Sequence, residues 1–231
     1  MVDPYHVWRA RLALKVFMHF QGTVNRECPI CGYHGSFLTY GDPPRADALC
    51  PNCSSLERHR LLRLALYQFP LPAQAEVLHF APERAVSAML PTNNYHSADL
   101  DTRIAEQKLN VEAIALPSKS VDVVVANHVL EHVDDRKALR EIHRILRSGG
   151  LFLATVPIVE GWDETYENPH VVSAIERRVH FGQEDHVRWY GRDFRQRVQE
   201  AGFGLEEFVA SGADCARYAL MPGERVFVAH R

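Results

Sequence analysis

Short apolar segments that alternate with helical segments from residue 76 onward are the feature that most constrains the fold. Strands that alternate with helices form a mainly parallel sheet with helices on both faces, so we expect an α/β fold. The predicted helices cover 81–90, 101–109 and 136–146, and the last one stops at Gly149–Gly150. The predicted strands are EVLHF (76–80), YHSAD (95–99), NVEAI (110–114), VDVVVAN (121–127), LFLATVP (151–157), GLEEFVA (204–210) and ERVFVAH (224–230).

Two pairs of cysteines ahead of this region indicate a metal site. Cys28 and Cys31 form one C-x-x-C pair, and Cys50 and Cys53 form a second. Four thiolates carried by two tight turns suit tetrahedral zinc. Two disulfides are one alternative, although they are rare in proteins without a secretory signal. The segment also resembles rubredoxin, which would imply iron. We predict a small structural zinc ribbon over 28–55.

Residues 1–27 precede the cysteines and are predicted to form an amphipathic helix. VWRARLALKVFMHF (7–20) is apolar at helical spacing and carries Arg9, Arg11 and Lys15. This helix either packs on the rest of the protein or binds a partner or a membrane surface. The N-terminus lacks the pattern of a secretory signal, and no apolar run approaches the ~20 residues of a membrane span. We therefore expect a cytoplasmic protein without a membrane partner.

A connecting helix is predicted between the ribbon and the α/β region, within 56–75. Ser54 and Glu57 have the spacing of a capping box, and Pro70 ends the pattern. The helix carries a basic cluster, which is either a solvated face or a contact for an anionic substrate or RNA. The formal net charge of −3 gives no overall attraction to nucleic acid, so we do not favour such a partner. The cluster consists of Arg58, His59, Arg60 and Arg63.

Polar residues stand at the ends of several predicted strands. Ligands of open α/β sheets bind beyond the carboxyl ends of the strands, so these residues are site candidates. Asp99 is the most informative, because a carboxylate at the end of the second strand suits bidentate binding of ribose hydroxyls. That position serves dinucleotides and adenosyl cofactors alike.

The segment VDVVVANHVLEHVDDRKALREIHRILRSGGLFLATVP (121–157) resembles class I S-adenosylmethionine-dependent methyltransferases of the type 11 group. With YHSADLD the likeness covers 76 to about 157. The whole chain further resembles bacterial zinc-ribbon methyltransferases that carry CPxC…SLERHR, VLHFAPE and FGQxDHVRxYG. The resemblance implies a Rossmann-like seven-stranded sheet in a methyltransferase domain over 76–231, with S-adenosylmethionine as the cofactor.

The loop after the first strand departs from the family pattern. His79 stands where the family has an acid, and Ala81, Glu83 and Ala85 stand where it has glycines. An alanine methyl is tolerated there where φ is negative, and Glu83 is expected to hold the cofactor's ammonium group. We predict a variant loop that retains the cofactor. The predicted cofactor-binding residues are His79, Phe80, Ala81, Pro82, Glu83, Asp99, Leu100, Asp101, Asn110, Val111, Asn127 and His128.

HVLEH (128–132) also matches the H-x-x-E-H pattern of a zinc peptidase. That pattern requires both histidines on one helix face, whereas His128 directly follows a strand, so we do not favour a protease. A catalytic divalent ion held by His128, Glu131 and His132 is a further alternative. A third possibility is that Glu131 and His132 bind no metal and only orient the loop and the start of the following helix.

Residues 158–192 are too long for a plain connection and are predicted to bind the substrate. Methyl transfer to a hydroxyl needs a base, for which His128 and His186 are the candidates. Arg188 is predicted to anchor an anionic part of the substrate. The favoured function is O- or N-methylation of a small molecule or sugar. The alternatives are a ribosomal-RNA methyltransferase and a cofactor-free binding protein assembled through its zinc ribbon.

Overall fold

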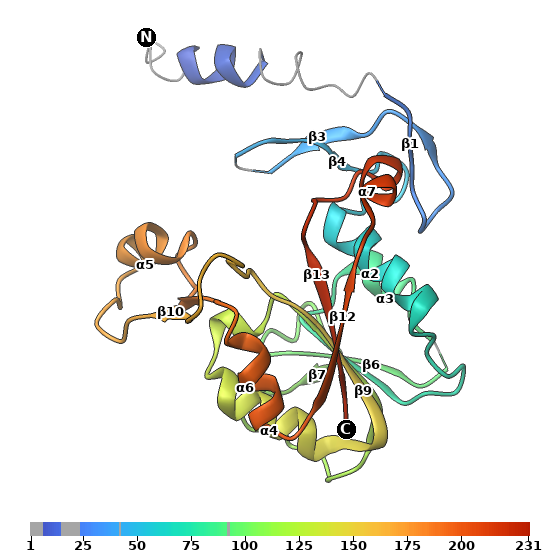
Figure 1. Ribbon diagram of the computed structural model, residues 1–231, viewed down its shortest axis with the longest axis vertical. Coiled ribbons are helices and arrows are strands. Elements are labelled where there is room, and N and C mark those ends of the chain that lie inside the picture. The colour runs from blue at the N-terminus through green and yellow to red at the C-terminus, as the bar shows by residue number, and fades with distance from the viewer. Residues whose placement is uncertain (1–6, 15–23, 42, 92) are drawn as a thin grey trace. The chain divides into compact units, whose positions relative to one another are not determined.

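A computed structural model describes residues 7–14, 24–41, 43–91 and 93–231 (Figure 1). The chain divides into two compact units, each made of two chain segments. The first unit is Met1–Phe69 with Val209–Glu224, and the second is Pro70–Phe208 with Arg225–Arg231. The domain boundaries expected from the sequence left residues 209–224 with the methyltransferase domain, whereas they group with the cysteine region.

The second unit is built on one seven-stranded sheet in the order β12-β13-β9-β8-β5-β6-β7. Neighbouring strands from β9 to β7 are parallel, and β13 pairs antiparallel with β9. This confirms the predicted α/β fold with a seven-stranded, mostly parallel sheet. The strands are β5 (Val77–Phe80), β6 (Tyr95–Asp99), β7 (Gln107–Lys108), β8 (Val121–Asn127), β9 (Leu146–Thr155), β12 (Gly204–Val209) and β13 (Arg225–His230).

Apolar residues of the central strands explain why the sheet is covered on both faces. All four residues of β5 are buried, as are all but one of the residues of β8. Strands buried on both faces are expected to be almost continuously hydrophobic, as VDVVVAN is. Helices α4 and α6 lie on one side of the sheet and α3 on the other (Figure 1). The helices are α3 (Arg84–Ser87), α4 (Asp135–Ile145), α5 (Ala174–Phe181) and α6 (Phe194–Glu200), with a 3-10 turn η1 at Leu130–His132.

The predicted elements between β6 and β8 are wrong. Residues 101–109 form no helix, and 110–114 form no strand. The Asp101 side chain accepts a hydrogen bond from the Arg103 backbone N–H at 3.0 Å, and Asn110 does the same for Glu112 at 2.9 Å. Such side-chain turns compete with helix and strand. The short strand β7 lies between the two turns instead.

The ends of two helices also differ from the prediction. The helix after β5 covers only Arg84–Ser87, and α4 ends at Ile145, before the two glycines. Leu146 already pairs with Val121, so β9 begins there and includes Gly149 and Gly150. At its start α4 is capped by the Asp134 side chain, which accepts from the Lys137 N–H at 3.1 Å.

The predicted substrate segment 158–192 carries structure of its own within the second unit. Strands β10 (Tyr166–Glu167) and β11 (Arg188–Trp189) pair antiparallel, and α5 lies between them in the chain. Ser173 and Glu176 form a capping box at the start of α5. Within the segment as a whole, Tyr190 and Phe181 are fully buried, whereas most of α5 is exposed.

The first unit contains two short hairpins, and helices lie in both of its chain segments. β1 (Arg26–Glu27) pairs with β2 (His34–Gly35), and β3 (Leu38–Tyr40) pairs with β4 (Arg45–Leu49). Helix α7 (Gly212–Tyr218), from the far end of the chain, contacts β1. Residues 7–14, which include Arg9 and Arg11, form an exposed helix; Lys15 and the rest of the predicted helix lie outside the described residues.

Helix α2 (Glu57–Gln68) corrects two expectations about the connecting segment. It is preceded by Leu56, whose N–H donates to His59 Nδ1 at 3.0 Å, so Ser54 does not cap it. Ser54 instead has a φ of +58°. The predicted basic cluster is not one surface either, because Arg60 is fully buried and His59 is buried.

The buried Arg60 guanidinium joins several segments of the first unit by hydrogen bonds. It lies 4.7 Å from the centroid of the Phe37 ring and donates only to backbone carbonyls. Burial lowers the pKa of Arg60, but an arginine keeps its charge in proteins because its ordinary pKa lies far above neutral pH. This placement removes the sequence argument for an anionic ligand at the cluster. The five acceptors are the carbonyl oxygens of Asp47, Ala48, Ser55, Tyr218 and Ala219, at 2.7–3.3 Å.

Candidate active site

The carboxyl ends of the parallel strands form a pocket of about 450 Å³ in the second unit. The chain passes from β5 to β6 on one side and then places β8 on the other side of β5. Open α/β sheets bind ligands at such a reversal of strand order. The volume suits a small molecule, since such pockets span roughly 300–1,000 Å³. The lining residues that the sequence predicted are Phe80, Ala81, Asp99, Leu100, Asn110, Val111 and His128.

The rest of the pocket wall was not predicted to bind the cofactor, although His132 was named as a candidate ligand of a divalent ion. Part of it continues the same strand ends, and part follows His128 into the 3-10 turn. Asp185 comes from the distant segment DHVR, and only that clustering of acid, histidine and arginine in the sequence could have indicated it. The additional lining residues are Ala98, Leu109, Val129, His132, Val133 and Asp185.

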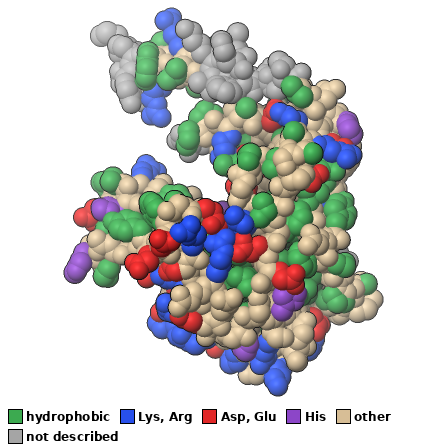
Figure 2. All heavy atoms as spheres, viewed as in Figure 1, with side chains coloured by type: hydrophobic (Ala, Val, Ile, Leu, Met, Phe, Trp, Pro, Cys, Tyr) green, Lys and Arg blue, Asp and Glu red, His purple; other side chains and the backbone are tan. Residues whose placement is uncertain are grey.

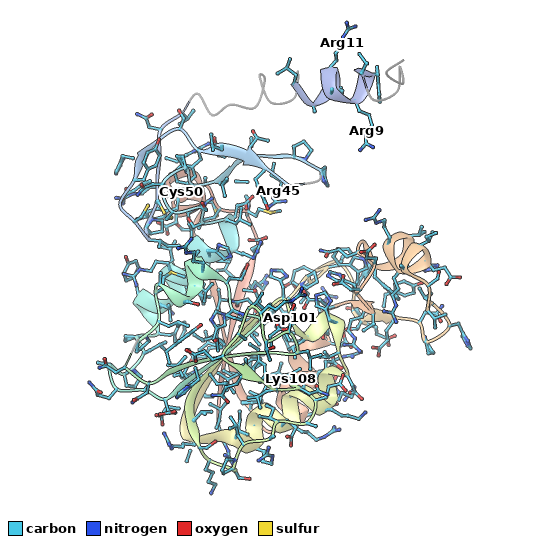
Figure 3. All side chains as sticks on the ribbon, turned by 180° about the vertical axis from the view of Figure 1, so that it is seen from behind. Arg9, Arg11, Arg45, Cys50, Asp101 and Lys108 are labelled. Carbon is cyan, nitrogen blue, oxygen red and sulfur yellow. The ribbon has the colours of Figure 1, made fainter. Side chains whose placement is uncertain are left out.

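Asp99, the last residue of β6, places a carboxylate on the pocket wall. Its Oδ1 accepts from the Asp101 N–H at 2.8 Å, and its backbone oxygen accepts from the Leu109 N–H at 3.2 Å. Asp101 itself pairs with Arg103 at 2.6 Å and does not line the pocket. Figure 3 labels Asp101 and Lys108, the second of which is the strand partner of Asp99 in β7. Asp99 therefore lines the pocket, whereas Asp101 is paired with Arg103 outside it.

The loop after β5 makes its turn without a glycine. Ala81 has a φ of +47°, so the negative φ under which an alanine would be tolerated is not found. Its N–H donates to the Ala98 carbonyl at 3.0 Å, which holds the turn against β6. The backbone thus adopts a conformation that favours glycine, and Ala81 carries the strain.

Several predicted cofactor residues lie outside the pocket wall. His79 is fully buried, and its Nδ1 lies 3.0 Å from the Tyr95 hydroxyl, which in turn lies 2.8 Å from Ser87 Oγ. Asn127 is buried and accepts from the Thr155 hydroxyl at 3.2 Å. These side chains support the strands beneath the site. The predicted residues absent from the wall are His79, Pro82, Glu83, Asp101 and Asn127.

His128 lies on the pocket wall at the end of β8, with a φ of +52°. Its backbone N–H donates to the Thr155 carbonyl at 2.9 Å. Its Nδ1 lies 3.0 Å from Oε1 of Glu131, a carboxylate with no exposed surface. A carboxylate on one ring nitrogen fixes the tautomer and leaves the other nitrogen as an acceptor. This is the arrangement that a general base requires.

His186 lies behind the wall rather than in it. The side chain is 4% exposed, and its ring meets the His132 ring edge-on, with centroids 4.7 Å apart. Burial is the main cause that lowers the pKa of His186, opposed in part by the negative charge of Glu131. Glu131, His132 and His186 form a cluster in which one nitrogen or oxygen atom from each side chain lies within 4.8 Å of the other two.

Arg188, which was predicted to anchor the substrate, is buried and bonded to neighbouring groups of the protein. Its Nη1 donates to the Leu130 carbonyl at 2.8 Å and to the Val133 carbonyl at 2.5 Å. Its Nε donates to Glu167 at 3.0 Å, and the side chain is 9% exposed. The guanidinium thereby holds the turn that carries Glu131 and His132.

The four paired cysteines meet in the first unit. The Cys28 and Cys53 sulfurs lie 3.6 Å apart, and those of Cys31 and Cys50 lie 3.7 Å apart. All four sulfurs lie within 4.8 Å of one another (Figure 3). No disulfide joins them. The donor set and its spacing are compatible with one tetrahedral metal ion.

The sheet order and the pocket at its strand ends define a Rossmann-like domain of the methyltransferase type. Residues 73–154 match the model of a methyltransferase domain family, which supports a class I methyltransferase domain in this chain. A probable S-adenosylmethionine-dependent methyltransferase of Mycobacterium tuberculosis is 39% identical over 56 residues, or 24% of this chain and 20% of the relative. A second such protein, from Mycolicibacterium smegmatis, is 45% identical over 49 residues, which are 21% of this chain and 19% of the relative. The chain thus matches about a fifth of the length of these relatives.

Solved structures show the same fold. A Haloferax volcanii methyltransferase in complex with the Trm112 methyltransferase activator aligns with a TM-score of 0.53 at 17% identity, over 75% of this chain and 90% of that one. The Burkholderia thailandensis 1,6-didemethyltoxoflavin-N1-methyltransferase aligns with a TM-score of 0.51 at 16% identity, over 74% of this chain and 76% of that one. Among the helices in the described ranges, none has the length and apolar character to cross a membrane.

Proposed function

We propose that the protein is an S-adenosylmethionine-dependent methyltransferase whose cofactor binds in the pocket at the ends of β5, β6 and β8. The observation that carries the proposal is Asp99, a carboxylate on the pocket wall at the position that suits ribose hydroxyls. When bound, the cofactor supplies a methyl group on a sulfonium. The family match over 73–154 supports the same conclusion.

The wall of the pocket fits the parts of this cofactor. Apolar side chains of Leu100, Leu109 and Val111 are suited to the two faces of an adenine ring. The Asn110 amide can accept from the adenine amino group. The turn at Ala81 faces the same pocket and is suited to the methionine part.

The proposed acceptor is a small molecule or a sugar with a hydroxyl or amino group. His128 would accept its proton, and the buried carboxylate of Glu131 would orient the His128 ring. His186 was predicted to share this role, but its burial behind His132 leaves His128 as the base that we propose. Figure 2 shows acidic and basic side chains interleaved across the middle of the visible face, a distribution unlike the single-sign surface typical of nucleic-acid binding.

We further propose that Cys28, Cys31, Cys50 and Cys53 bind one structural zinc ion. A zinc–sulfur bond of about 2.3 Å gives a tetrahedron with edges of about 3.8 Å. The sulfur distances of 3.6 and 3.7 Å agree with that edge. Reduced thiolates persist in a reducing compartment, which favours the cytoplasm.

Calorimetry with S-adenosylmethionine and S-adenosylhomocysteine on zinc-replete protein tests the cofactor site. We expect micromolar binding, and Asp99→Ala should weaken it about 10- to 100-fold, because a hydrogen bond to a charged group contributes roughly 1.5–3 kcal/mol. Asp101→Ala is the matched control, because Asp101 pairs with Arg103 outside the pocket and should change affinity less than threefold. Absence of binding at millimolar cofactor to folded wild-type protein would reject the proposal.

A further inference from the structure

Glu131 has a carboxylate oxygen without a partner in the protein interior. The residue has no exposed surface, and its Oε1 is 3.0 Å from His128 Nδ1. Its Oε2 has no hydrogen-bond partner among the described residues. A buried oxygen that is left unsatisfied costs roughly 1–3 kcal/mol, and more when it is charged. A buried oxygen of this kind indicates a bound ligand that would supply the missing interaction.

His186 faces the same space with a second buried atom that lacks a partner. The residue is 4% exposed, and its Nδ1 has no hydrogen-bond partner among the described residues. The ring is also hydrogen-bonded to the backbone of Phe181. A histidine that donates from one nitrogen to a backbone carbonyl has a lone pair fixed on the other. Nδ1 is therefore suited to bind a cation.

His132 completes the cluster and connects it to the pocket. Its Nδ1 lies 3.3 Å from the Asp185 carboxylate, which leaves Nε2 for a ligand. Both His132 and Asp185 line the pocket. The donor atoms of Glu131, His132 and His186 all lie within 4.8 Å of one another. Small side-chain rotations would bring them to the roughly 3.3 Å that separates neighbouring donors around a tetrahedral zinc ion, given bond lengths of about 2.0–2.2 Å.

We propose that Glu131, His132 and His186 bind a divalent transition-metal ion, in addition to the ion held by the four cysteines. Two imidazoles and one carboxylate suit zinc, iron or cobalt, whereas magnesium and calcium prefer oxygen donors. Three protein ligands leave further coordination positions open, which distinguishes such a site from a closed structural site. His128, which interacts with Glu131 Oε1, is not a ligand in this proposal.

The surrounding structure holds the three donors in place. The Val187 N–H donates to the Glu131 carbonyl at 2.9 Å, which ties the segment of His186 to the turn η1. Arg188 bonds the carbonyls of Leu130 and Val133 on either side of that turn. Each ligand also has an outer partner, since His128 contacts Glu131, Asp185 contacts His132 and the Phe181 backbone contacts His186. Outer partners of this kind orient metal ligands in proteins.

Cobalt titration of protein that carries one equivalent of zinc, held by the four cysteines, tests the site without any cofactor or acceptor. We expect one Co²⁺ per chain with d–d absorption in the visible range and no sulfur-to-cobalt charge-transfer band. Glu131→Gln and His132→Ala should each weaken Co²⁺ binding at least tenfold. His170→Ala is the matched control, because His170 is an exposed histidine of the same segment and should bind cobalt as the wild type does.

The outcomes separate this proposal from the cofactor site and from the cysteines. Glu131→Gln keeps the side-chain volume, and His132 is only partly buried, so circular dichroism should show both variants folded. Absence of cobalt binding to the wild type, or equal affinity in the wild type and both variants, would overturn the proposal. A charge-transfer band would place the cobalt on the cysteines and would also count against it. Cofactor binding is measured separately, so either proposal can fail alone.

Discussion

Ala81 and His128 share an unusual backbone conformation at the pocket wall. Their φ angles are +47° and +52°, and neither is a glycine. A left-handed conformation costs a residue with a side chain about 1–2 kcal/mol, and such strain often occurs at functional sites. Both turns follow strands that end at the pocket, so the strain is located where the backbone must leave the sheet sharply.

Substitution of Ala81 tests this strain. Ala81→Val should lower the free energy of unfolding by about 2 kcal/mol, because a β-branched side chain strongly disfavours positive φ. Ala81→Gly should change it by less than about 1 kcal/mol, since relief of strain offsets the greater freedom of the unfolded chain. Urea unfolding measures both. Ala88→Val is the control at an exposed position with a φ of −66°, and an equal loss there would contradict the explanation.

The sequence predicted some residues of the site but not the surroundings of others. Asp99 was predicted because the end of the second strand is visible in the hydrophobic pattern. The approach of His186 to Glu131 was not, because those residues are 55 positions apart and meet only through the fold of 158–192. Arg60 and Arg188 were predicted as exposed or ligand-binding cations. A charged residue in the sequence gives no sign of the carbonyls that will surround it when it is buried.

At the level of elements, strands were predicted where short apolar segments alternate with helical segments. β5 and β8 follow mostly apolar runs, and strands were also predicted at β6, β9, β12 and β13. The segment from Asp101 to Ile114 was predicted wrongly, because Asp101 and Asn110 form side-chain turns that the periodicity does not show. Helix α4 was predicted almost in full, although it stops before Gly149 because β9 already pairs with β8 at Leu146.

Helix α4 carries a histidine whose protonation should couple to folding. His143 packs edge-on against Phe203 at 5.0 Å, and burial, with the nearby charge of Arg231, lowers its pKa. An unfolded histidine binds its proton near pH 6.5. Below that pH the unfolded state therefore holds more protons than the folded state, and stability falls as the pH falls. Above about pH 7.5 both states are neutral at this residue and it contributes no pH dependence.

His143→Gln should reduce this loss of stability on acidification. Urea unfolding at pH 7.5, 6.5 and 5.5 would show a smaller decrease for the variant than for the wild type. His170→Gln, at an exposed histidine, should retain the wild-type dependence. Parallel pH profiles for His143→Gln and the wild type would show that His143 is not responsible.

At the scale of the molecule, the two units differ in what stabilises them. The second unit has a large apolar core along the sheet. The buried cluster around the cysteines of the first unit consists of Cys28, Phe37 and Cys50. Helix α2 of the same unit buries further apolar residues, but among the described residues the region of the cysteines has only this small cluster. Apparent binding energies of structural zinc reach roughly 10–16 kcal/mol in small domains.

Removal of the metal from the cysteines should therefore affect one unit selectively. With a strong chelator under reducing conditions, hydrogen exchange should accelerate at least tenfold in β4 and α2, whereas β5 and β8 should remain protected. Mass spectrometry of peptides from each unit measures the difference. Restored protection after addition of one zinc equivalent is the control. Unchanged exchange in β4 and α2 would contradict a structural role for the metal.

The acceptors of Arg60 have a consequence for how the chain is made. Tyr218 and Ala219 supply two of its five carbonyls and lie more than 150 residues after it in the sequence. A ribosome releases the cysteine segment well before the α7 segment, so the first unit cannot complete its hydrogen bonds until the second unit's strands β5 to β9 have emerged. The cysteine segment is thus expected to complete its fold only after later segments have been synthesised, and during that interval Arg60 has only the carbonyls of Asp47, Ala48 and Ser55.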